Sequence, residues 1–400
     1  MLIKFTYPVK SSLVLSEHWP LTVGDIKIEW TIDKNRVTAI SGSVPVTSAD
    51  QLPTAKPSST PGVKLDINFG RNSREDEVEE AIRTVWGLLS LFAFVEIDLA
   101  GVETSWIAEN EDERARLEVF RFSRSVEKTD PQRPRRLRYD LVARATAAAR
   151  AAAHYEIPLG FLRRGTRALH NGQYIDAFYS LFFFLETLFA PGYSKPSKVK
   201  KLLWDSKVVR DAVAQSRAPL LREGQLNVAK RDKLLAMTDE QLLYHLVSVR
   251  GTLHHHALGR PGIWHPDKAD HFREEAILLH QVVHSIAVSN AMSLLFARDR
   301  DEDLLGSARR AGAIMKVRIE ASGLIDGTRH NLQPFVFTVP SRHIDRAVID
   351  SVHRRFREQF AGGPKNVHVL EYKLMSEDAS LVYAVWRRSV TNDSMHHYPS

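Results

Sequence analysis

The segment RALHNGQYIDAFYSLFFFLETLFA, Arg167 to Ala190, sets the expected architecture of the middle of the chain. Its first part has the composition of a basic helix and ends at Asn171-Gly172, a dipeptide typical of turns. The aromatic and apolar remainder predicts a second helix, which Pro191-Gly192 stops. Helices joined by such short connections are typical of a helical bundle.

The helical pattern continues on both sides of this segment, from about residue 133 to residue 300. An Ala-rich helix precedes it, and Pro158 is expected to separate that helix from the next. Thr238, with Gln241 three residues later, forms a capping-box pattern, and Asp270 is expected to cap the last long helix. The predicted helices span residues 141–155, 160–172, 173–190, 195–205, 207–217, 238–253 and 270–298.

The two flanking regions alternate apolar and polar residues, as strands do. We therefore expect an α+β multidomain chain with an N-terminal β-rich domain (1–130), a central all-α bundle (133–300) and a small α+β C-terminal domain (312–390). Each flanking region also contains one predicted helix, at residues 74–97 and 341–360. The predicted strands span residues 2–9, 25–32, 36–44, 63–69, 116–124, 315–322, 334–340, 366–375 and 380–390. Residues 46–62, 127–136 and 298–312 lack a hydrophobic period and are expected to be loops or linkers, and residues 391–400 to be disordered.

The composition excludes several kinds of site. The 400 residues contain no cysteine, which excludes disulfides, thiolate nucleophiles and thiolate metal ligands. Lysine and arginine exceed the acids by seven, which permits nucleic-acid binding without requiring it. The most apolar runs fall short of the ~20 residues of a membrane span, and the first residues alternate like a strand rather than a signal peptide. We expect a cytoplasmic protein without membrane contact.

The segment LVSVRGTLHHHALGRP, Leu246 to Pro261, concentrates candidate functional side chains. A metal site is not expected there, because neighbouring histidines on a helix diverge by about 100° and no HExxH motif occurs in the chain. His280 and His284 have i, i+4 spacing, but they lie in an apolar helix, where core histidines are usual. A metal-dependent hydrolase remains one alternative. A plain helix end is another, because cations are favoured near a helix C-terminus.

The order of these features resembles the HEPN superfamily of helical bundles, in which an arginine is followed after four to six residues by a histidine. Arg250 with four intervening residues gives His255, and with five gives His256. The earlier basic helix, the Asn-Gly turn and the aromatic helix ending in Leu-Glu, with Glu186 in that position, are similar to the same family. The resemblance covers about residues 155 to 300.

The resemblance implies a metal-independent endoribonuclease that leaves a 2',3'-cyclic phosphate, acts as a homodimer and serves in a defence or toxin system. It implies catalytic roles for Arg250, His255 and His256, substrate binding by His254 and Glu186, RNA as the partner, and no cofactor. Because Arg250 and His255 do not share a helix face, we expect either that the helix loosens near Gly251 or that the histidine acts across the dimer. Catalytic members usually place Asn, Asp or His directly after the arginine. Gly251 departs from that pattern and keeps open a non-catalytic module that binds nucleotide, RNA or a protein.

Overall fold

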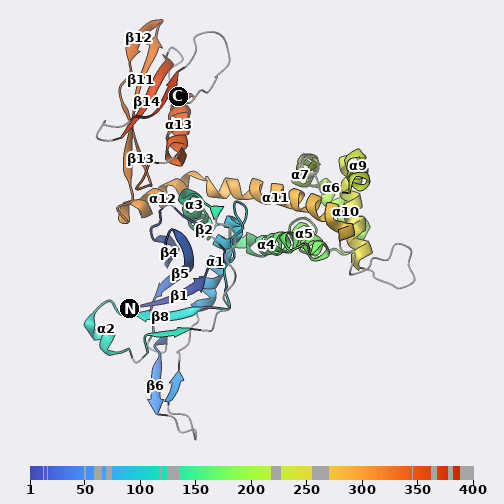
Figure 1. The fold of residues 1–400 in the computed structure, drawn as a ribbon, viewed down its shortest axis with the longest axis horizontal. Coiled ribbons are helices and arrows are strands. Elements are labelled where there is room, and N and C mark those ends of the chain that lie inside the picture. Colours follow the sequence, from blue (N-terminus) through green and yellow to red (C-terminus); the bar gives the residue numbers. More distant parts are fainter. Residues whose placement is uncertain are drawn as a thin grey trace.

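The computed structural model shows an α+β protein in which a long helical region connects an N-terminal and a C-terminal sheet (Figure 1). It describes residues 1–11, 13–15, 17–48, 51–57, 65–68, 74–117, 119–123, 135–217, 227–254, 270–344, 346–361, 367–376 and 382–387. Strands dominate the beginning and the end of the chain, and helices dominate residues 139 to 310. The predicted α+β class is therefore confirmed.

The N-terminal part is built on a sheet that has eight strands among the described residues. Its centre is β1 (Leu2–Pro8), antiparallel to β5 (Arg36–Pro45) and β8 (Glu103–Ile107). Alternate side chains of β1 are fully buried, as expected for a strand with one face on the core. The other strands are β2 (Leu13–Val14), β3 (Leu21–Val23), β4 (Ile26–Asp33), β9 (Arg121–Ser123) and β10 (Arg135–Arg136), and a separate hairpin pairs β6 (Thr54–Pro57) with β7 (Leu65–Asn68).

Helix α1 (Glu75–Leu89) ends eight residues before the predicted end at residue 97. The apolar residues that follow it turn back instead, because the chain is tied to neighbours on both sides. Trp86 Nε1 donates to the carbonyl of Val95 at 2.6 Å, and Lys10 N donates to the carbonyl of Glu96 at 2.8 Å. A short helix, α2 (Glu111–Ala115), also occurs in this part and was not predicted. Tertiary pairing with the end of β1 thus overrides the local helical pattern after Leu89.

The central helices contain the predicted hairpin of α4 (Glu156–His170) and α5 (Tyr174–Phe189), with Gly172 at positive φ in the turn. Helix α11 (Arg273–Leu295) packs against both. It runs across the top of α4 and α5 in Figure 1. The remaining helices of this region are α3 (Tyr139–Ala148), the 3-10 turn Ala153–Tyr155, α6 (Pro196–Asp205), α7 (Lys207–Gln215), α9 (Val228–Ala236), α10 (Asp239–His254) and α12 (Arg298–Arg310).

The structure confirms one predicted helix start and corrects two others. Thr238 N donates to Gln241 Oε1 at 2.8 Å and Gln241 N donates to Thr238 Oγ1 at 3.2 Å, so the capping box before α10 is confirmed. Asp270 does not cap α11, whose N-cap is Phe272. Pro158 lies in the first turn of α4 rather than before it. A proline is tolerated there because its missing N–H would have no helical acceptor.

The C-terminal unit consists of β11 (Met315–Ile325), β12 (Thr328–Asn331), β13 (Phe335–Val339), α13 (Arg346–Ala361), β14 (Val367–Ser376) and β15 (Val382–Arg387). Its predicted strand and helix order is confirmed, with β12 as an addition. The predicted linker at 298–312 is wrong for most of its length, because α12 occupies it and buries Leu304 and Ala308. The expected disordered tail and most of the 127–136 linker lie outside the described residues.

Two hydrophobic cores are present among the described residues. The larger runs without interruption from the N-terminal sheet through the helices, from Ile3 to Ala313. The smaller belongs to the C-terminal unit and includes Val317 and Phe356. Within the described chain, Asp270–Leu295 alone has the length and composition to cross a membrane. Many of its apolar side chains are buried against other helices, which accounts for its composition.

Candidate functional site

Arg250 lies in the last turn of α10, next to the buried face of the helix. The predicted core stripe of α10 is confirmed, because Leu242, Leu246, Val249 and Leu253 are all buried. The helix is unbroken through Gly251 as far as His254, so the expected loosening near Gly251 is wrong for the described residues. A Cβ added at Gly251 would meet nothing within 4 Å, so no close neighbour requires glycine there.

The guanidinium of Arg250 is paired with the carboxylate of Glu186 on α5. Nη2 lies 2.9 Å from Glu186 Oε1, and both side chains are only 14% exposed. Oε1 has no hydrogen bond of good geometry, so this contact is an ion pair rather than an aligned bond. The pair joins α10 to α5, the two helices that carry Arg250 and Glu186 of the predicted site.

Arg250 retains unused hydrogen-bonding capacity. Its one hydrogen bond to a described residue runs from Nη1 to the carbonyl of Ser194 and is long, at 3.4 Å. A guanidinium carries five N–H donors. Among the described residues, the contacts of Arg250 with Glu186 and Ser194 therefore leave N–H donors that could bind an anion.

Burial raises the pKa of the Glu186 carboxyl, and the positive charges of Arg250 and His254 oppose that rise. His254 is exposed and lies one turn after Arg250 on the same face of α10. The structure therefore brings Arg250, Glu186 and His254 together. His255 and His256, the predicted catalytic histidines, lie outside the described residues.

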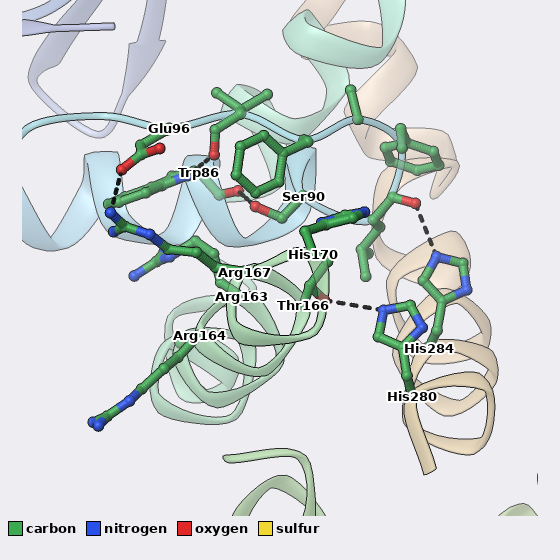
Figure 2. Close-up of a pocket in the computed structure, with 16 residues that line it drawn as sticks. Trp86, Ser90, Glu96, Arg163, Arg164, Thr166, Arg167, His170, His280 and His284 are labelled. Atoms are coloured by element: carbon green, nitrogen blue, oxygen red, sulfur yellow. Dashed lines mark hydrogen bonds and ion pairs between the residues drawn. The ribbon is translucent and has the colours of Figure 1, made fainter. Parts of the chain in front are cut away.

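A second concentration of polar groups was not found from the sequence. A cavity of about 450 Å³ lies between the segment after α1, helix α4 and helix α11 (Figure 2). His280 and His284 line it. Both were expected to be core or edge histidines with hydrogen-bonded rings, and the structure confirms a partner for one nitrogen of each ring. His280 Nε2 lies 3.0 Å from Thr166 Oγ1 and His284 Nε2 lies 3.0 Å from the carbonyl of Leu91. Their i, i+4 spacing was the one signal of this cavity in the sequence.

Among the residues that the structure describes, no group of three or more His, Asp or Glu side chains is arranged to hold a metal ion. No family model, curated protein or solved structure matches the chain.

Proposed function

We propose that the protein is a metal-independent endoribonuclease and that residues from about 155 to 300 form a HEPN-like bundle. One observation carries the proposal: the 2.9 Å contact between Arg250 and Glu186. It joins the arginine of the Arg-x4-His motif to the Leu-Glu position of the aromatic helix, 64 residues earlier in the chain. Two parts of the predicted pattern, Arg250 and Glu186, thus lie in contact in the structure.

The chemistry needs only the groups that the motif supplies. The RNA 2'-hydroxyl oxygen forms a bond to the adjacent phosphorus while the bond from phosphorus to the 5'-oxygen breaks. A neutral histidine accepts the 2' proton, and a protonated histidine donates a proton to the leaving oxygen. Arg250 donates to two non-bridging oxygens and stabilises the charge of the pentavalent transition state. The products end in a 2',3'-cyclic phosphate and a 5'-hydroxyl.

Within this proposal, Glu186 is a positioning residue. Its carboxylate would repel a phosphate, but its contact with Nη2 fixes the guanidinium next to the exposed His254. His255 is proposed as the catalytic histidine, His256 as its alternate, and His254 as a phosphate contact. Because one chain supplies one arginine-histidine set, two chains would combine their sets across a shared cleft.

An exposed aromatic patch beside Glu186 supports a dimer. Phe183 is 42% exposed and its ring lies 5.5 Å from that of Phe161 and 6.3 Å from that of Tyr179. Phe183 and Tyr179 continue the face of α5 that carries Glu186. Sedimentation at micromolar concentration is expected to give twice the chain mass, and Phe183→Arg to reduce it to one chain. A monomeric wild type would contradict the dimer.

A non-catalytic binding module is the second candidate, and one observation favours it. The Arg250 side chain is only 14% exposed and already has a carboxylate partner, as expected of a structural arginine. The two candidates differ in the fate of RNA. Cleavage of labelled RNA in excess EDTA, lost in Arg250→Lys and His255→Ala, supports the nuclease. Binding of RNA through Arg250 without cleavage supports the module.

The role in a defence or toxin system and the cytoplasmic location are proposals that follow from this function. A nuclease that cuts RNA acts where RNA is, and the absence of cysteine from the chain fits a reducing compartment.

A further inference from the structure

The cavity between α1, α4 and α11 has the size of a small-molecule site. Its volume of about 450 Å³ falls within the range of about 300–1,000 Å³ that is typical of ligand pockets. It lies where the segment after α1 meets the helices, so parts of the chain that are far apart in sequence enclose it (Figure 2).

One wall of the cavity is apolar and aromatic. Trp86, Leu91, Phe92 and Phe94 line it, and the ring of Phe94 stands edge-on to that of His170 at 5.3 Å. Gly160 of α4 also lines the cavity, and a Cβ added there would meet nothing within 4 Å. The cavity therefore has open space between its aromatic side chains and α4, because Gly160 has no side chain to fill it.

The other wall is basic. Arg163, Arg167 and His170 follow Gly160 at intervals of three and four residues, so they share one face of α4. Arg163 lies 3.7 Å from the centre of the Trp86 ring and donates to the carbonyl of Arg83. Burial lowers the pKa of Arg163 to about 10, so it stays charged at neutral pH. The side chain of Arg164 points away from the cavity in Figure 2.

Arg167 is the basic group best placed to take a new partner. Nη2 lies 2.9 Å from Glu96 Oε1, but the Arg167 side chain is 59% exposed. An ion pair of that exposure contributes little free energy. Figure 2 shows this pair at the edge of the group of labelled side chains. An anion that entered the cavity could therefore replace Glu96 or add to it.

Two histidines of α11, His280 and His284, add hydrogen-bonding groups to the lining. His284 Nε2 donates to the carbonyl of Leu91, which leaves Nδ1 as an acceptor in the neutral ring. Burial lowers the pKa of His280 to about 4, so its ring is neutral near pH 7. The lining thus combines fixed positive charge, an aromatic wall and neutral polar groups.

From this combination we infer that the cavity is a binding site for a small aromatic anion, a flat ring that carries a phosphate or a carboxylate. The ring would pack on Phe92 and Phe94, and the anionic group would contact Arg167 and Arg163. The site is separate from the Arg250 cluster. The inference therefore holds whether or not Arg250 cleaves RNA.

Isothermal titration calorimetry of the full chain tests the inference with two anionic probes. AMP represents the aromatic phosphates and indole-3-acetate the aromatic carboxylates, and adenosine, indole and inorganic phosphate serve as the corresponding fragments. We expect at least one anionic probe to bind with a dissociation constant at least tenfold below those of its own fragments, because ring and anion act together. Which probe binds identifies the anionic group.

Three variants connect binding to the cavity. Gly160→Leu places a side chain at a position that lines the cavity and has room for a Cβ, and it should abolish binding while keeping the melting temperature. Arg167→Gln should weaken binding about tenfold or more, the usual loss of a charge-assisted bond. Gly306→Leu on α12, at a helical glycine where an added Cβ would meet only Arg310 Nη1 at 3.7 Å, is the matched control and should bind as wild type does. Absence of binding by both anionic probes, or binding that survives Gly160→Leu, would overturn the inference.

Discussion

Arg250 illustrates how burial decides which substitution is informative. Its side chain and that of Glu186 are each 14% exposed, so replacing the arginine by alanine would leave a partly buried carboxylate without its cation. Loss of activity in that variant would not separate chemistry from folding. Lysine keeps the positive charge beside Glu186 but cannot make a two-pronged contact with phosphate. Arg250→Lys is therefore the cleaner test of a catalytic role.

His280 predicts a specific dependence of stability on pH. Burial first, and then the charges of His284 and His170, lower its pKa from 6.5 to about 4. Between these two values the unfolded chain binds a proton that the folded chain excludes. The free energy of unfolding should therefore fall as pH falls from 6.5 towards 4, by up to roughly 3 kcal/mol from this group.

Urea unfolding of wild type and His280→Gln at pH 7 and pH 5 measures this effect. We expect the variant to lose less stability than wild type between the two pH values. His330→Gln, at an exposed position of β12, is the control and should behave as wild type. An equal pH dependence in wild type and His280→Gln would show that His280 does not titrate as proposed.

Helix α3 is attached to the N-terminal sheet by a buried hydrogen-bonded tyrosine. Tyr139 OH accepts a hydrogen bond from Trp19 N at 3.0 Å and donates one to the carbonyl of Trp19. The two rings meet edge-on at 4.4 Å. Burial accordingly raises the pKa of Tyr139.

Tyr139→Phe should lower the free energy of unfolding by roughly 1–3 kcal/mol, because it leaves a buried N–H and a buried carbonyl unpaired. Tyr193→Phe, at a residue that is 48% exposed, is the matched control and should change stability by less than about 0.5 kcal/mol. Chemical denaturation measures both. Equal stability of Tyr139→Phe and wild type would mean that water satisfies the backbone of Trp19.

The helices whose periodicity is strong and whose ends carry turn residues could be predicted from the sequence. Helix α4, which ends at the Asn171-Gly172 turn, is of this kind, and the capping box at Thr238 fixed the start of α10. The end of α1 could not be predicted, because contacts of Val95 and Glu96 with distant residues outweigh the local pattern. Helix α12 was not predicted, because most of its residues are polar and its few buried residues, such as Leu304, do not form a clear hydrophobic period.

Of the two candidate sites, one could be predicted from the sequence and the other could not. Arg250 and Glu186 were placed in one predicted site because the order of features around them resembles that of the HEPN superfamily. The cavity could not, because its lining comes from the segment after α1, from α4 and from α11, and none of these carries a motif. Side chains such as Arg163 and Trp86 acquire a joint role only when the fold places one over the other.

The whole molecule has a core that crosses the predicted boundary between the N-terminal domain and the helices. Helix α1 packs against α3 and α4, and a Cβ at Gly87 would lie 2.7 Å from Leu159 Cβ. The C-terminal unit has its own core and contacts the rest through polar bonds, including Ser341 Oγ to Glu17 Oε1 at 2.7 Å and Arg342 N to Glu17 Oε2 at 2.9 Å. We therefore expect the first predicted boundary to lie within one folded unit and the second to separate two folded units.

Two fragments test this difference. Residues 133–300 expressed alone should be insoluble or lack a cooperative thermal transition, because the fragment exposes the apolar surface that α1 covers. Residues 1–313 should fold with a cooperative transition, because that fragment retains the larger core. Circular dichroism and thermal melting measure both. A stable 133–300 fragment would show that the helices form an independent domain, as the sequence predicted.

The central claim is that Arg250 supports metal-independent cleavage of RNA, and its most direct test is one assay. End-labelled RNA is incubated with wild type, Arg250→Lys and Arg309→Lys in excess EDTA, after matched melting temperatures have been verified. Arg309 is an exposed arginine in the last turn of α12 and serves as the control. We predict cleavage to 2',3'-cyclic phosphate ends by wild type and Arg309→Lys, and a loss of about 100-fold in Arg250→Lys. No cleavage by wild type, cleavage abolished by EDTA, or equal cleavage by Arg250→Lys would contradict the claim.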